Sequence, residues 1–172
     1  GSLPTAAKGW VKLETVAAST SATVDMETGF DSTYDQYMIK VTGALPVSDG
    51  VYVYGRLKTN AFQTGADYAY TRRIYDAWTS STGATKFEMS GTVGNDASEG
   101  WGCTMWLDDV SSTTRNKVVW YVMTFSSTDG STFHSQGSFA YTGGQEALTG
   151  IQFYMSTGSI LSGTFTLYGL AK

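Results

Sequence analysis

Cysteine, histidine and proline are scarce in this chain of 172 residues. Cys103 is the only cysteine and His134 the only histidine, so an intrachain disulfide is impossible and a zinc site built from these ligands is excluded. Proline occurs only at Pro4 and Pro46. No apolar run approaches the roughly 20 residues of a membrane-spanning helix, and no signal peptide is recognised. The sequence therefore predicts no disulfide framework, no metal, no cofactor and no membrane insertion.

Positive charge is also scarce. Eleven lysines and arginines stand against 15 aspartates and glutamates, which gives a net charge of −4, and only Arg72 and Arg73 are adjacent. A chain with this balance repels the phosphate backbone, so we expect no nucleic-acid binding. Cys103 lies between Trp101 and Trp106 with no basic neighbour in the sequence. We therefore expect a buried, unreactive thiol.

Aromatic residues, glycine, serine and threonine are abundant instead. Aromatic residues make up 14% of the chain and there are 20 glycines, a combination that favours strands joined by many turns. Short runs with period-two alternation recur along the sequence, and no apolar helical period persists over three turns. The predicted strands are residues 10–16, 22–26, 36–42, 51–59, 68–75, 86–92, 101–108, 117–125, 132–141, 151–156 and 163–170.

These strands predict an all-β fold with about eleven strands and almost no helix. Strands without intervening helices argue for an antiparallel two-sheet β-sandwich, and the strand number favours a jelly-roll-like arrangement. A sandwich of another topology is the alternative. Residues 1–9 have no periodicity and are interpreted as a leader and N-terminal arm, in which Gly1-Ser2 is typical of a cloning scar. Residues 10–172 are expected to form a single domain.

Motifs near both ends of the chain resemble a diffuse group of tailed-phage virion proteins, of the marine or cyanophage type. The pattern begins with Ala22-Thr-Val-Asp-Met26 and continues through Gly29-Phe-Asp-Ser-Thr-Tyr-Asp-Gln-Tyr37. Its matching residues are Asp31, Ser32, Thr33, Tyr34, Asp35, Tyr37, Pro46, Asp49, Gly50, Ser156, Gly158, Ile160, Ser162, Gly163, Thr164, Leu167, Tyr168 and Gly169. The resemblance implies a jelly-roll structural protein of the decoration or tail-appendage type. The middle, from about Thr71 to Gly144, carries no such motif.

No catalytic constellation is evident. A serine triad would have to use His134, and no Gly-x-Ser-x-Gly sequence surrounds a serine. Asp108 and Asp109 are adjacent, so on a strand they would point to opposite faces and could not act as a carboxylate pair. Glu88 and Glu99 belong to no motif. We therefore expect a protein that is not an enzyme.

Asp31 and Asp35 are the remaining candidate metal ligands, for calcium, at a spacing of four residues. The sequence lacks the regular calcium-loop pattern. A turn capped by its own Asp, Ser and Thr side chains is the favoured interpretation.

Tyrosine and arginine recur at alternate positions on two successive predicted strands. The two triplets are Tyr52, Tyr54 and Arg56, and then Tyr68, Tyr70 and Arg72. If the two strands pair, the triplets form one Tyr/Arg surface, which could be a subunit interface, the inner face of a sheet or a glycan platform, in that order of preference. Trp78, in a stretch predicted to be the loop 76–84, is the best candidate for an exposed aromatic residue.

The sequence thus leads to three functional hypotheses. The first is a non-enzymatic virion structural or adhesion protein, located in the virion as a capsid decoration or tail-appendage receptor-binding domain. Its partners would be other virion proteins and a host surface glycan, with binding loops at 60–67, 76–84 and 109–116. The resemblance implies a homo-oligomer, with a homotrimer expected. The alternative is a monomeric carbohydrate-binding module of a secreted enzyme, and a small hydrolase is disfavoured.

Overall fold

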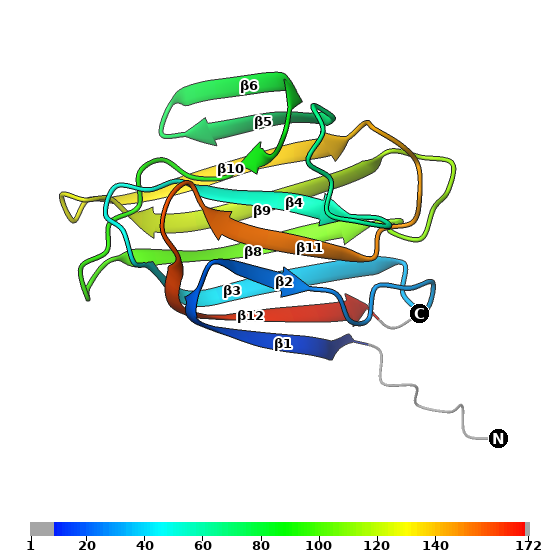
Figure 1. Ribbon diagram of the computed structural model, residues 1–172, viewed down its shortest axis with the longest axis horizontal. Helices are drawn as coiled ribbons and strands as arrows, with labels where there is room; N and C mark the ends of the chain where they lie inside the picture. Colours follow the sequence, from blue (N-terminus) through cyan, green and yellow to red (C-terminus); the bar gives the residue numbers. More distant parts are fainter. Residues whose placement is uncertain (1–8, 171–172) are drawn as a thin grey trace.

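Two antiparallel β-sheets lie face to face in the computed structural model, which describes residues 9–170 (Figure 1). The larger sheet has eight strands in the order β1 (Trp10–Ser21), β12 (Ile160–Leu170), β3 (Gln36–Pro46), β8 (Gly100–Asp108), β9 (Lys117–Ser126), β10 (Thr132–Tyr141), β5 (Tyr68–Ile74) and β6 (Ala77–Ala84). The smaller sheet has four strands in the order β2 (Thr23–Met26), β11 (Gly150–Met155), β4 (Val53–Lys58) and β7 (Phe87–Glu88). Residues 9–170 contain no helix. The predicted all-β two-sheet sandwich is therefore confirmed.

Alternating side chains build the core between the two sheets. In β9, every second residue from Lys117 to Phe125 is buried, and the residues between them are exposed. The larger sheet contributes buried residues such as Ile39 and Leu107, and the smaller sheet contributes Leu57 and Phe153. Each such side chain stabilises the fold by about 1.5–3 kcal/mol when it leaves water. This burial fixes which face of each strand points to solvent.

Phe87 joins the two sheets at one end of the core. Its ring stacks on Phe139 of β10 with the ring centroids 3.5 Å apart and meets Tyr68 of β5 edge-on at 6.0 Å. On the smaller sheet the same ring lies directly over the Cα of Gly55, where a Cβ atom would collide with it. A glycine in the middle of β4 is therefore required by close packing.

The hairpin of β5 and β6 extends beyond the smaller sheet at the upper edge of the molecule in Figure 1. The prediction of a loop at 76–84 was wrong, because residues 77–84 form strand β6. Its side chains are mostly exposed because no second layer covers them. The sequence of β6 therefore lacks the alternation of apolar and polar residues that a half-buried strand shows. The turn is made by Tyr75, which has a positive φ of 54°.

Other predicted boundaries also differ from the observed ones. Residues 9–170 contain twelve strands where about eleven were expected, and the predicted strand 86–92 is reduced to the two residues of β7. The jelly-roll topology stays a prediction, because the observed strand orders establish the sandwich alone. Of the interpreted leader 1–9, residues 1–8 lie outside the described residues.

Candidate functional site

The two Tyr/Arg triplets do not form one surface. Strand β4, which carries Tyr54 and Arg56, belongs to the smaller sheet, and β5, which carries the second triplet, belongs to the larger sheet. The pairing of these strands, on which the predicted Tyr/Arg surface depended, is therefore wrong. Successive strands separated by a loop need not pair, because a sandwich is closed by connections that pass from one sheet to the other.

The second triplet faces the inside of the sandwich. Tyr68 is fully buried, its hydroxyl donates to the carbonyl of Gln63, and it accepts a hydrogen bond from the backbone N–H of Leu57 at 2.8 Å. Burial raises the pKa of Tyr68 well above its ordinary value. Tyr70 is half-buried and packs against the core. Tyr68 therefore connects the two sheets and is not accessible to a ligand.

Arg72 is also buried, and it connects the sheets by charge. Its guanidinium group forms an ion pair with Glu88 of β7 and donates a hydrogen bond to the backbone carbonyl of Ser90. The side chains of Arg72 and Glu88 are only 10% and 19% exposed. Arg72 therefore has a structural partner and is not available to a ligand.

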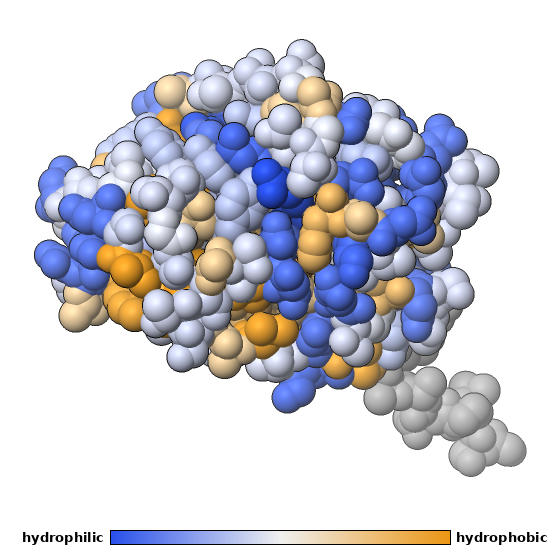
Figure 2. All heavy atoms as spheres, viewed as in Figure 1, coloured by the Kyte–Doolittle hydropathy of each residue, from blue (hydrophilic) through white to orange (hydrophobic). Residues whose placement is uncertain are grey.

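The first triplet lies on the opposite side of the molecule, at the outer surface of the smaller sheet. Tyr52 and Tyr54 stack with centroids 6.3 Å apart, and Tyr54 meets Tyr154 of β11 edge-on. The Nζ atom of Lys86 lies 4.5 Å from the centroid of Tyr54, and the Arg56 guanidinium lies 4.8 Å from that of Tyr154. These rings therefore already form cation–π contacts with basic side chains of the protein itself. Figure 2 shows this side of the molecule, where hydrophobic residues form only small separate groups.

Trp78 is exposed, as predicted, but it lies on a strand. It is 63% exposed on β6 and stands opposite Arg73 of β5 in the register. The Arg73 guanidinium lies 5.9 Å from the indole and forms an ion pair with Asp76 at 2.9 Å. This arrangement orients Trp78 over the outer face of the larger sheet.

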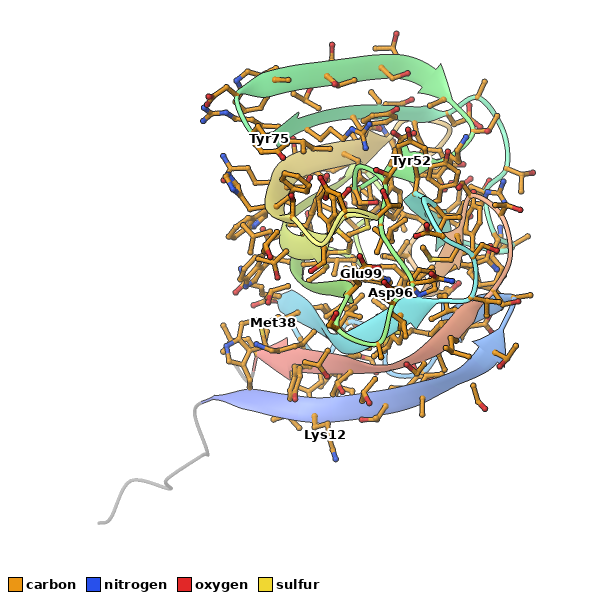
Figure 3. The ribbon with its side chains drawn as sticks, turned by 90° about the vertical axis from the view of Figure 1, so that its left-hand side faces the viewer. Lys12, Met38, Tyr52, Tyr75, Asp96 and Glu99 are labelled. Carbon is orange, nitrogen blue, oxygen red and sulfur yellow. The ribbon has the colours of Figure 1, made fainter. Side chains whose placement is uncertain are left out.

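The outer face of the larger sheet carries further aromatic residues that the sequence analysis did not select. Trp106 of β8 and Trp120 of β9 are register partners and stack with centroids 3.9 Å apart and an interplanar angle of 10°. Met38 of β3 is the partner of Trp106 and lies on the side of the sandwich opposite Tyr52 in Figure 3. Trp120 is 46% exposed and Val122 is 41% exposed. These residues form an apolar band on a face that an antiparallel sandwich usually leaves polar.

Two hollows lie side by side on this face. The first, of about 240 Å³, is lined by Trp78 and Trp120 and by Gln136 and Ser138 of β10. The second, of about 460 Å³, is lined by Lys40, Gly102, Thr104, Val122, Thr124, His134 and Gln136, with backbone and neighbouring atoms of the same strands. Val122 and Gln136 line both hollows, which therefore form one groove. We call this pair of hollows, from Trp78 to Lys40, the outer groove.

The outer groove combines tryptophan rings with hydroxyl, amide, imidazole and ammonium groups. Aromatic planes alternate with hydroxyl and amide groups, a composition that suits the apolar faces and hydroxyl groups of sugars. His134 is exposed on β10 at the second hollow, and no aspartate or glutamate lines either hollow. Within residues 9–170, no group of three or more His, Cys, Asp or Glu side chains could hold a metal ion.

The remaining sequence candidates have structural surroundings of their own. The Asp31 carboxylate accepts a hydrogen bond from the backbone N–H of Thr33 at 2.7 Å, and the hydrogen bonds from Thr33 lower its pKa. The Tyr37 hydroxyl donates to the Asp31 carbonyl. This is the capped turn that the sequence favoured over a calcium loop. Cys103 is buried in β8, and burial raises the pKa of its thiol to about 12.

Comparison with known proteins gives no relative for this fold or sequence: no family model, no curated protein and no solved structure matches the chain. Within residues 9–170, no helix is long and apolar enough to cross a membrane. The geometry of the outer groove therefore carries the functional argument.

Proposed function

We propose that this protein is a non-enzymatic recognition module that binds a glycan chain in the outer groove. The observation that carries the proposal is the position of Trp78 and Trp120 at one hollow, which Gln136 and Ser138 also line. Flat indole rings bind the apolar faces of sugar rings, and the hydroxyl and amide groups of Ser138 and Gln136 supply hydrogen-bonding partners for sugar hydroxyls. Solvent-exposed tryptophans in a contiguous apolar band are typical of interaction sites.

The rigidity of the groove supports this function. Trp120 is held by its stack on Trp106, and Trp78 is held by Arg73 on a two-stranded hairpin. A ligand therefore loses little free energy to the ordering of the protein side chains when it binds. Binding sites on strands are also more precisely placed than sites on loops.

The sequence resemblance supports a location on a virion. The module would then act as a capsid-decoration or tail-appendage receptor-binding domain, assembled as a homotrimer among other virion proteins. A carbohydrate-binding module of a secreted enzyme would use the same groove as a monomer. Light scattering after size-exclusion chromatography separates the two, because a trimer has three times the monomer mass of 18.5 kDa.

The test of the groove is a screen on a broad glycan array, followed by calorimetric titration of the best ligand. Trp120→Ala and Trp78→Ala should each weaken binding by about 1–2 kcal/mol, or roughly five- to thirtyfold. Trp10→Ala is the matched control, because it removes an exposed indole from β1, at the far edge of the same sheet. Array silence from folded protein, or equal losses in all three variants, would contradict the proposal.

A further inference from the structure

The second hollow of the outer groove is built around an unpaired cation. Lys40 of β3 stands on one side and His134 of β10 on the other, with Thr104 of β8 and Thr124 of β9 between them. Lys40 is exposed, and its ammonium group has no ion pair or hydrogen bond within residues 9–170. The other polar groups that line the hollow are uncharged or can donate hydrogen bonds. The hollow therefore presents donors without a carboxylate to satisfy them.

Acidic residues are absent from the lining of both hollows, although they outnumber basic residues in the chain. The chain has 15 acidic residues against 11 basic ones. Asp108 is on the same face at the end of β8, where it accepts a hydrogen bond from the Gln36 amide at 2.8 Å. A lysine left uncompensated in an acidic protein attracts an anion locally, while the net charge disfavours binding of polyanions elsewhere.

The floor of this hollow is left open by a glycine. Gly102 lies on β8 between the inward-facing Trp101 and Cys103, so its missing side chain would point outward into the hollow. A Cβ atom there would meet only the Val41 carbonyl oxygen, at 3.2 Å. A larger residue at this position would occupy the space beside Lys40.

The two hollows together have the reach of an extended ligand. Trp78 on β6 and Lys40 on β3 are separated by five strand spacings, which amounts to roughly 24 Å along the sheet. Several linked sugars can span this distance, whereas one sugar cannot. The shared lining of Val122 and Gln136 makes the path continuous.

We propose that the outer groove binds an acidic glycan, with a sugar ring against Trp120 and an anionic substituent, carboxylate or sulfate, beside Lys40. This inference rests on the proposed function and specifies its ligand class. The ammonium of Lys40 forms a charge-assisted hydrogen bond with the anion, and Gln136 and Thr104 donate to the same group or to adjacent sugar hydroxyls. A neutral glycan would leave Lys40 unpaired.

The test compares oligosaccharides that differ only in charge. Calorimetric titrations would use hexagalacturonate, its carboxyl-reduced neutral counterpart, and a sulfated derivative of that neutral counterpart. At least one acidic ligand should bind about tenfold more tightly than the neutral one, and this advantage should decline with added salt. The carboxylate and sulfate arms identify which anion the hollow accepts.

Three variants locate the effect. Lys40→Gln should weaken binding of the acidic ligand about tenfold and so remove its advantage over the neutral ligand, whereas Gly102→Val should weaken binding of both ligands by filling the hollow. Lys12→Gln is the matched control, because Lys12 is an exposed lysine on the same face at the edge strand β1. It should change the affinity for the acidic ligand less than twofold. Thermal melts of each variant verify that the fold is retained.

The outcomes separate this inference from the proposed function. Equal binding of acidic and neutral ligands through Trp120 would overturn the acidic-glycan inference and retain glycan recognition. Binding of none of them would contradict both. Equal losses in Lys40→Gln and Lys12→Gln would show a diffuse charge effect and overturn the role of the hollow. Comparable binding of a single-stranded oligodeoxynucleotide would also overturn it, because stacking and a cation would then be serving a nucleic acid.

Discussion

Replacing Arg72 with methionine removes the cation that connects β5 to the smaller sheet. Methionine replaces the apolar stem of the arginine side chain, so the loss is mainly that of the charged guanidinium group. Glu88, only 19% exposed, is then left without its partner, and the Ser90 carbonyl loses a donor. Breaking a buried ion pair from one side costs about 3–5 kcal/mol, and the residual exposure places the expected value near the lower limit, about 3 kcal/mol.

A double-mutant cycle measured by urea unfolding isolates this interaction. Glu88→Gln alone should destabilise the protein, because it leaves the Arg72 charge without its carboxylate. The double variant Arg72→Met/Glu88→Gln contains no unpaired charge, so its cost should be lower than the sum of the two single costs by about 2 kcal/mol. Arg115→Met is the control, since the exposed pair of Arg115 with Asp109 contributes less than about 1 kcal/mol.

Two results would refute this reasoning. If Arg72→Met cost no more than Arg115→Met, the ion pair between the sheets would contribute nothing beyond a surface pair. If the two single effects added within about 0.5 kcal/mol, Arg72 and Glu88 would be acting independently. Either result would also remove the reason for regarding β5, and hence the Trp78 hairpin, as fixed to the sandwich at this point.

Three further predictions follow from the packing. Gly55→Ala should lower the free energy of unfolding by about 1–3 kcal/mol in urea titration, because the added methyl collides with the ring of Phe87. Cys103 should not react with a thiol reagent in the native protein and should react fully after denaturation, because it is buried and its thiol pKa is raised to about 12. Burial raises the pKa of Tyr68 and Tyr121 above 10, so the folded state keeps protons that the unfolded state releases. Their contribution to the free energy of unfolding should be fully present below about pH 10 and should decrease as the pH rises above that value. Urea midpoints measured between about pH 8 and pH 11 would show this decrease.

The sequence predicted those parts of the fold that follow from local alternation. Strands such as β9 and β10 have a buried and an exposed residue in turn, and their positions were found within a residue or two. Strand β6 was missed because both of its faces meet solvent, so its Ser and Thr residues carry the composition of a loop. The pairing of strands was beyond reach, because it depends on contacts between segments far apart in the chain.

Of the residues that line the outer groove, only Trp78 was chosen from the sequence as a binding residue, and the others were missed for a related reason. The two Tyr/Arg triplets attracted attention because they repeat, yet repetition along the chain does not indicate which sheet a strand joins. The signal that could have found the groove is in residues 117–125, where Val118, Trp120 and Val122 alternate with Val119 and Tyr121. A strand that is apolar on both faces in a two-layer fold must expose one apolar face.

The exposure of that apolar face is what argues for recognition over architecture. Trp120 and Val122 point away from the space between the sheets, so they add nothing to the core that holds the sandwich together. An exposed apolar band favours association and gives the fold itself no benefit that polar β-formers such as threonine could not supply. Where residues depart from the pattern that the fold requires, a binding role is the usual reason. Lys40, which has no ion pair within residues 9–170, lies on the same face beside that band, and the proposed acidic glycan would contact both.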